Sequence, residues 1–262
     1  MDRKHPCSAV VGVFFVLLAL MLGGCKPDSP AHGTLFVLQL GTNPPGAIAA
    51  LSEVIEPLRA RFDALGMQPF FERQPGGDFV LKVGRLRTNQ ISAVRQMITA
   101  QGQLEFRMIH PNSDELVQKG LVVSGYELLK QSSPGPGGHD LGRTYLVNCN
   151  PERGLTGKYI KRVTVTMQAV TGAPELGFEL DAEGARLFEE ITRQYQPSGG
   201  QYRQLAIVLD GQIFSIPRIV GVITAGRGHI SGALTVPQAL ALQSILENPL
   251  NLPCRVIEQR SF

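Results

Sequence analysis

The stretch Pro69-Phe-Phe-Glu-Arg-Gln-Pro-Gly-Gly-Asp-Phe-Val-Leu-Lys-Val83 decides the fold of the first half of the chain. Two apolar runs flank the turn sequence Gln74-Pro-Gly-Gly77, and Phe79, Leu81 and Val83 alternate on one face. This pattern predicts two short strands joined by a tight turn. Because a lone hairpin is only marginally stable in water, the neighbouring segments must supply the rest of a sheet and its cover.

Helical segments lie on both sides of this hairpin. Residues 46–65 repeat apolar side chains at three- and four-residue steps and stop at Gly66, as an amphipathic helix does. A second helix, which we expect Asn89 to cap, carries Val94 and Met97 on its apolar face. Further strands are expected at 34–40 and 103–109. The order is then β-α-β-β-α-β, the split βαβ pattern of ferredoxin-like sandwiches.

The second half also mixes strands and helices, which makes the whole chain α+β. Leu205-Ala-Ile-Val-Leu209 is an apolar strand that ends in Asp210-Gly211, a strong hairpin signal, and Gln212–Ile216 is the expected return strand. Further strands are expected at 163–167 and 176–180. Helices are expected to begin after Asp181 and after Thr235. Residues 111–162 show no regular pattern, and 131–138 is rich in Gly, Pro and Ser, as in a flexible excursion.

The N-terminus has the pattern of an export signal. Arg3 and Lys4 precede the uncharged apolar run 9–22, which would span about 21 Å as a helix, short of the roughly 30 Å hydrocarbon core of a membrane. Leu22-Gly-Gly-Cys25 resembles a bacterial lipobox. That resemblance implies cleavage between Gly24 and Cys25 and acylation of Cys25 by groups such as palmitate. An uncleaved anchor is the alternative, and both readings place the remaining chain outside the cytoplasm.

Composition and motif spacing argue against several classes of function. The chain has 25 Lys and Arg against 22 Asp and Glu, without like-charge blocks, so we expect no nucleic-acid partner. The histidines and cysteines are not at metal-ligand spacing, and Asp210 is better explained as a turn residue than as a catalytic carboxylate. Glu189 and Glu190 diverge on their helix and are expected to form a solvated face. We expect no catalytic, metal or cofactor site, and whether Cys149 and Cys254 form a disulfide stays open.

An ordered set of motifs carries a family resemblance. From Leu205 to Glu258 the chain contains Leu-Ala-Ile-Val-Leu-Asp-Gly, Ser-Ile-Pro-Arg-Ile, Gly-His-Ile-Ser-Gly, Leu-Glu-Asn-Pro-Leu-Asn-Leu-Pro and Val-Ile-Glu. This set resembles the first periplasmic domain of SecD, the membrane subunit that helps to move secreted proteins through the translocon. Leu58-Arg-Ala-Arg-Phe-Asp-Ala-Leu-Gly66 and Ala100-Gln-Gly-Gln-Leu-Glu-Phe-Arg107 extend the resemblance to the first half. The later membrane helices of that family are not found in this sequence.

The resemblance implies a division of the chain and a role. We expect a signal peptide at 1–24, a tether at 25–33, a ferredoxin-like base at 34–110 with a returning strand within 246–262, and an inserted α+β head at 111–245. The implied role is that of a non-enzymatic protein of the bacterial cell envelope, on the periplasmic side and anchored to the membrane through acylated Cys25. It would bind extended secretory polypeptide or a translocon subunit without proton coupling. The alternative is an envelope scaffold that has lost the transport role.

The sequence also suggests where a partner would bind. Gln212–Ile216, together with Ile219–Ile223, is expected to leave an exposed sheet edge to which an extended passenger adds a strand. The predicted contact residues are Gln212, Phe214, Ile216 and Ile219.

Overall fold

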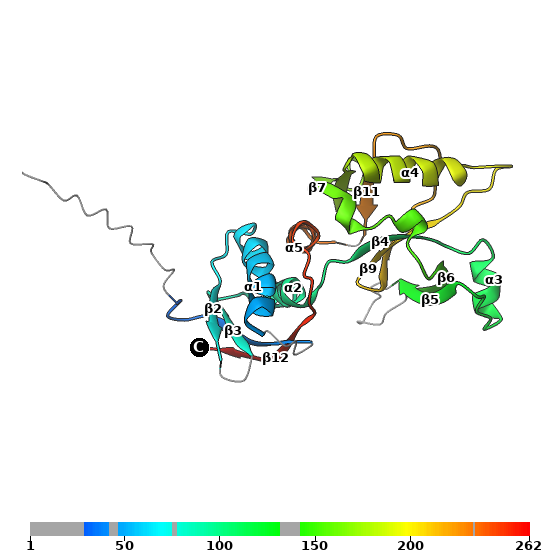
Figure 1. Ribbon diagram of the computed structural model, residues 1–262. Helices are drawn as coiled ribbons and strands as arrows, with labels where there is room; N and C mark the ends of the chain where they lie inside the picture. Colours follow the sequence, from blue (N-terminus) through cyan, green and yellow to red (C-terminus); the bar gives the residue numbers. More distant parts are fainter. Residues whose placement is uncertain (1–28, 42–46, 75–77, 132–141, 233) are drawn as a thin grey trace, which may run out of the picture.

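The computed structural model describes residues 29–41, 47–74, 78–131, 142–232 and 234–262 (Figure 1). Their strands form sheets of four, five and three strands. The four-stranded sheet lies at one end of the molecule with two helices, and the other two sheets lie at the opposite end (Figure 1). We use "base" for the four-stranded sheet with its two helices, and "head" for the elements from β4 to β11.

The base is a ferredoxin-like α+β unit whose last strand comes from the end of the chain. Its sheet has the antiparallel order β12-β1-β3-β2. The expected returning strand is therefore present: β12 pairs with β1 from Thr34 opposite Ser261 to Leu40 opposite Cys254. The elements of the base are β1 (Thr34–Leu40), α1 (Ala47–Asp63), β2 (Phe70–Arg73), β3 (Phe79–Val83), α2 (Thr88–Thr99) and β12 (Cys254–Ser261).

The prediction that residues 103–109 close the base sheet is wrong. The corresponding strand, β4 (Leu104–Met108), pairs with β9 in the head, and β12 takes the closing place in the base. Every second residue of β4 is buried, a pattern that fits any strand with one covered face and therefore cannot show which sheet it joins. The chain leaves the base at Gly102, which has a φ of 82° and where an added Cβ would lie only 2.7 Å from the Ile245 carbonyl oxygen. The base therefore ends near Gly102, not at residue 110.

The head contains two sheets packed around a common core. The larger sheet has the order β4-β9-β10-β5-β6, and the smaller has the order β11-β8-β7. Phe106, Phe178 and Phe188 meet in that core with ring centroids 5.6 to 6.0 Å apart. The elements are β4, α3 (Ser113–Gln118), β5 (Tyr126–Gln131), β6 (Arg143–Asn148), the short turns Glu152–Gly154 and Gly157–Tyr159, β7 (Ile160–Met167), β8 (Pro174–Leu180), α4 (Ala182–Gln194), β9 (Leu205–Leu209), β10 (Gln212–Ser215) and β11 (Arg227–Ser231).

Four of these elements were not expected from the sequence: α3, β5, β6 and β11. The strand β5 has no fully buried residue, and its Leu128 is half exposed, so it lacks the apolar alternation of a typical strand. In β11 only Ile230 is buried. Their places in the sheets depend on pairing with distant strands, which local periodicity does not report. Most of the Gly- and Pro-rich excursion, residues 132–141, lies outside the described residues.

Two of the three expected helix N-caps are present in the structure. Asp181 accepts a hydrogen bond from the Gly184 amide at 2.8 Å, and Thr235 forms the expected capping box with Gln238. The expected cap at Asn89 is wrong, because α2 begins at Thr88 and the Gln90 side chain accepts from the Arg87 amide at 2.9 Å.

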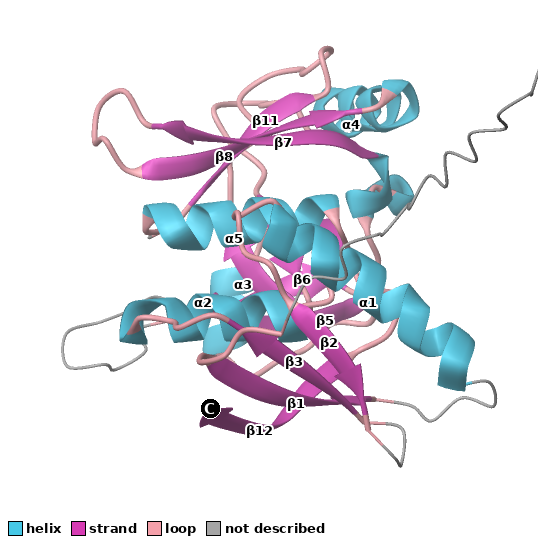
Figure 2. Ribbon diagram, turned by 90° about the vertical axis from the view of Figure 1, so that its left-hand side faces the viewer, coloured by secondary structure: helices cyan, strands magenta, loops and turns pink. Residues whose placement is uncertain are grey.

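One further helix, α5 (Val236–Glu247), connects the two parts (Figure 2). Ala241 and Ile245 pack into the base core, whereas Leu242 and Leu246 pack into the head core. Because these residues follow one another on the helix, α5 is apolar on two sides and is buried between base and head. It also binds the edge of β7, where the Gln243 side-chain amide donates to the Val163 carbonyl at 2.9 Å.

A buried arginine fixes the junction between base and head. Arg61, on α1, is fully buried and donates hydrogen bonds to the carbonyl oxygens of Met97, Ala100, Gln101 and Asn248 at 2.6 to 3.3 Å. These carbonyls belong to the two segments where the chain crosses between base and head. Burial lowers the pKa of Arg61 to about 10, and the charge of Asp210 opposes that change. The guanidinium thus satisfies the ends of α2 and α5 at once.

The Asp210-Gly211 turn contributes to the same junction. Both residues have positive φ, as in the expected two-residue hairpin between β9 and β10. The Asp210 carboxylate accepts from the backbone amides of Gly102 and Gln103 at 3.2 and 2.8 Å. It therefore joins the head hairpin to the segment that leaves the base.

The two described cysteines are free thiols in different surroundings. Cys149 is exposed, and Cys254 is buried at the start of β12. Burial raises the pKa of Cys254 to about 12, so this thiol stays protonated at physiological pH.

Candidate functional site

The structure contradicts the predicted binding edge. The strand β10 lies inside the five-stranded sheet, between β9 and β5, and therefore offers no free edge. Of the predicted contacts, Ile219 is buried, Phe214 and Ile216 are half-buried against the head cores, and only Gln212 is exposed. The sequence signal was an apolar hairpin, and such a pattern does not distinguish an edge strand from an inner strand. The predicted cleavage and acylation site, Gly24 and Cys25, lies outside the described residues.

The head has a polar cleft of about 550 Å³ at a different place. It lies among four segments that are distant in sequence. They are the connection from β4 to α3, the start of β6, the loop before β9, and Arg218. The sheet itself curls to bring these segments together, since Ile109 pairs with Val147 and the Ile109 amide donates to the Gln204 carbonyl at 3.1 Å. The lining residues are Ile109, His110, Pro111, Asn112, Asp114, Arg143, Tyr145, Gln201, Tyr202, Arg203, Gln204 and Arg218.

Aromatic rings position two of the cleft's arginines. The Arg203 guanidinium carbon lies 5.2 Å from the centroid of the Tyr195 ring, and that of Arg143 lies 5.4 Å from the Tyr145 ring. Tyr195 is itself held, because its hydroxyl donates to Glu152 at 3.3 Å. Burial and the Glu152 carboxylate raise the pKa of Tyr195, which keeps the phenol neutral. Stacking fixes the plane of a guanidinium while leaving its N–H edge available.

The surroundings of the cleft combine charge with exposed apolar surface. Arg143 pairs with Asp114 at 2.7 Å, whereas Arg218 makes no side-chain hydrogen bond or ion pair with any described residue. Tyr202 is half exposed, and Val220, just beyond Arg218, is 75% exposed. A site with cationic groups beside exposed apolar side chains suits a polypeptide segment better than a purely polar small molecule.

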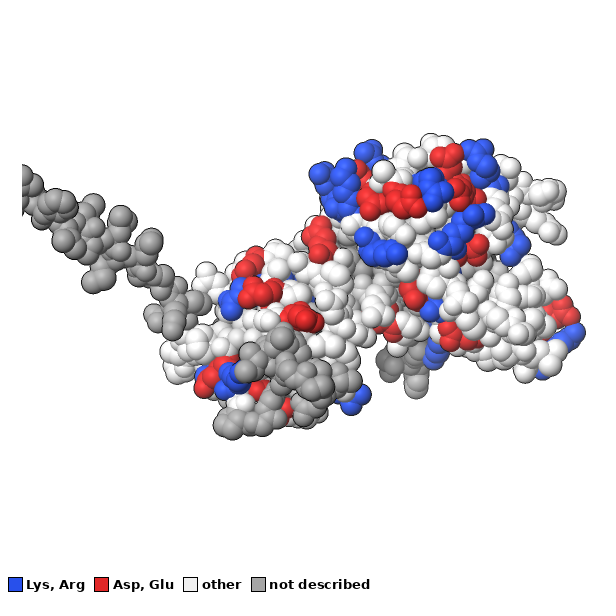
Figure 3. Space-filling model, in the orientation of Figure 1, with Lys and Arg blue, Asp and Glu red and all other residues white. Residues whose placement is uncertain are grey.

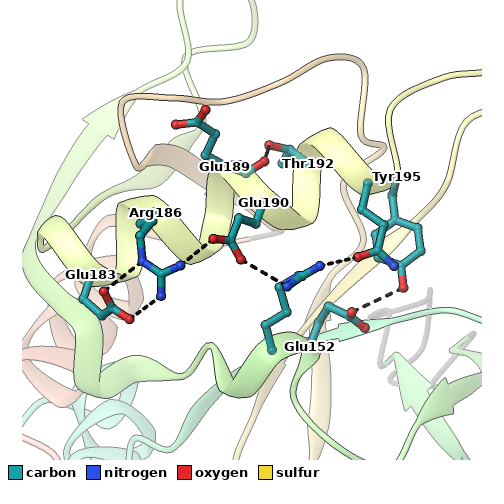
Figure 4. A network of polar contacts seen from close by, with 9 residues as sticks. Glu152, Glu183, Arg186, Glu189, Glu190, Thr192 and Tyr195 are labelled. Carbon is teal, nitrogen blue, oxygen red and sulfur yellow. Dashed lines mark hydrogen bonds and ion pairs between the residues drawn. The ribbon is translucent and has the colours of Figure 1, made fainter.

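Acidic residues of α4 take part in a network of ion pairs on the outer face of the helix (Figure 4). Arg186 binds both Glu183 and Glu190, and Arg153 binds Glu190 at 3.1 Å and Gln194 at 2.7 Å. The Arg186 guanidinium holds the pKa of Glu183 below its usual value. These contacts tie the outer face of α4 to the Glu152–Gly154 turn, in agreement with the expected solvated face.

Outside the cleft, the described surface of the head carries mixed charge. Basic and acidic side chains are interspersed over the α4 side of the head (Figure 3). Among the described residues, no three His, Cys, Asp or Glu side chains are arranged to hold a metal ion. No helix within those residues has the length and apolarity needed to cross a membrane.

Comparison with known proteins first finds a family that is similar to the head. Residues 126–250 match the family model described as "SecDF, P1 head subdomain". This range runs from β5 to the end of α5 and so contains most of the cleft. The second half of the chain is therefore similar to the SecDF P1 head subdomain.

Individual relatives extend the similarity to most of the chain. The chain is 28% identical over 216 residues to the protein translocase subunit SecD of Syntrophobacter fumaroxidans, and 26% identical over its full length to the SecDF subunit of Thermus thermophilus. These matches cover 39% and 36% of the two relatives, so the chain spans less than half of their length. The SecD subunits are thus homologues over most of this chain.

Solved structures support the same fold. The structure titled "Structure and function of a membrane component SecDF that enhances protein export" matches with a TM-score of 0.60 and 25% identity, covering 87% of this chain and all of that one. A crystal structure of SecDF in a "Super-membrane-facing form" matches with a TM-score of 0.64 over 91% of this chain and 32% of the other. The base, the head and their order thus follow the SecDF fold.

Proposed function

We propose that this protein is a lipid-anchored protein of the bacterial cell envelope that binds extended polypeptide during export. The observation that carries the proposal is the homology to SecD over both base and head. The head cleft, with its arginines and the exposed Tyr202 and Val220, is the proposed contact surface. Its volume of about 550 Å³ fits a few side chains of a passing segment, not a folded protein.

The proposed binding is passive and involves no catalysis. Arginine side chains in general keep their charge throughout the physiological pH range, so the proposed binding needs no proton coupling. A bound ligand can then change the position of the head relative to the base only if it binds one arrangement of the two parts more tightly than another. A translocon subunit that presents an extended segment would bind in the same way.

We expect the purified protein to bind unfolded secretory polypeptide with a dissociation constant in the range of about 1 to 100 μM, because ordering a flexible chain offsets much of the contact energy. Titration by fluorescence anisotropy measures this, with the same polypeptides in folded form as the control. Folded controls should not bind. Absence of binding to either form at high micromolar concentration would exclude the proposed polypeptide binding and favour the alternative of an envelope scaffold.

The proposed lipid anchor at Cys25 leads to a separate prediction. Wild-type protein in cells should incorporate labelled palmitate, and Cys25→Ala should lose the label completely, since acylation needs this thiol. The exposed Cys149 supplies a matched control, because Cys149→Ala should keep the label. A wild-type protein that stays in the membrane without label would instead have an uncleaved N-terminal anchor.

A further inference from the structure

The head cleft has more positive charge than its own residues neutralise. Its lining contains three arginines and one carboxylate, that of Asp114, which pairs with Arg143. No described acidic side chain forms an ion pair with Arg203 or Arg218. The two backbones are adjacent, because the Ile219 amide donates to the Arg203 carbonyl at 2.9 Å and Gln204 pairs with Arg218. Both residues therefore line the same cleft from adjacent backbone segments.

One of these arginines has a donor that the protein leaves unused. The Nε atom of Arg203 is buried without a hydrogen-bond partner, while the Tyr195 ring holds the plane of the guanidinium. An unpaired buried donor is costly, and buried polar groups in proteins are normally satisfied. A planar acceptor that approaches the edge of this group can bind two of its N–H donors at once.

We propose that Arg203 and Arg218 bind a carboxylate on the extended polypeptide, from an Asp or Glu side chain or the chain end. This inference rests on the proposed function and specifies what the cleft selects. A polypeptide source fits better than a free anion because the exposed apolar side chains of Tyr202 and Val220 flank the arginines. Residues beside the acidic group would pack there, and a lone phosphate would leave that surface unused. The head thus prefers passengers with an acidic residue beside apolar ones.

The test compares two labelled extended peptides that differ only in Asp and Glu against Asn and Gln. We expect wild-type protein to bind the acidic peptide at least about tenfold more tightly, since charge-assisted hydrogen bonds differ from neutral ones by that order. Arg218→Gln should remove most of this preference, and the double variant Arg203→Gln/Arg218→Gln should remove all of it. Arg162→Gln, which removes an exposed arginine on β7 outside the cleft, should leave the preference unchanged.

Each outcome decides the proposal. Equal affinity for the two peptides, or an unchanged preference in Arg218→Gln, overturns the carboxylate site. Because the exposed Arg218 side chain forms no hydrogen bond or ion pair with a described residue, this variant should fold normally, and thermal unfolding checks that it does. Displacement of the acidic peptide by inorganic phosphate alone at equal concentration would identify a small-anion site and overturn the proposal. If wild-type protein binds both peptides equally, the proposed function of binding extended polypeptide still holds. If it binds neither peptide, that function is excluded as well.

Discussion

Replacing Arg61 by alanine is expected to lower the free energy of unfolding by about 3 to 5 kcal/mol. The change removes a buried guanidinium and leaves up to four carbonyl oxygens at the ends of α2 and α5 without their donor. Hydrogen bonds from charged donors contribute about 1.5 to 3 kcal/mol each, and the cost of burying the charge offsets part of that sum. Urea unfolding followed by circular dichroism measures the loss.

Arg59 provides the matched control for this prediction. It lies two residues earlier on α1, where its guanidinium contacts the Phe71 ring at 5.3 Å and is only half-buried. Arg59→Ala should cost less than about 1 kcal/mol. Arg61→Lys should fall between the two, because an ammonium group keeps the charge but has three donors at a single point. Equal stability of Arg59→Ala and Arg61→Ala would show that the junction does not depend on the buried guanidinium.

Removal of residues 254–262 is expected to abolish cooperative unfolding of the base. The deletion takes away β12, which pairs with β1 along all of its length, and removes the buried Cys254 from the base core. The central strand β1 would become an unpaired edge with apolar residues on both faces, a state that favours aggregation. Differential scanning calorimetry should show the loss of a transition, and size-exclusion chromatography should show association.

A substitution in the same strand separates pairing from side-chain effects. Ile257 is half exposed, so Ile257→Thr keeps the backbone pairing of β12 and should change stability by about 0.5 kcal/mol or less. A truncated protein that melts like the full chain would contradict the assignment of β12 to the base.

Local periodicity was sufficient to predict most helices and hairpins but not the partner of each strand. The hairpin at Asp210-Gly211 and the cap at Asp181 depend on residues close in sequence, and both were predicted. The placement of β4 and the inner position of β10 depend on pairing between distant segments. Burial of every second residue is the same in a strand of either sheet, so the sequence could not place β4 or β10 correctly.

The functional surface was harder to predict for the same reason. The cleft combines segments around residues 110, 143, 203 and 218, and none of them carries a motif of its own. Arg61 did leave a signal that was missed. It follows Leu58 by three positions and Val54 by seven, which places a charged residue on the apolar face of α1. A charge at such a position predicts a buried, fully bonded side chain.

The most direct test of polypeptide holding is photo-crosslinking in intact cells from a probe that replaces Tyr202 at the mouth of the cleft. We predict adducts with polypeptides in transit through the envelope, which decrease when export is blocked. A probe at Arg162, an exposed position outside the cleft, should give few such adducts. Equal adducts from the two positions, or none from position 202 while export is active, would contradict the assignment of polypeptide binding to the head cleft.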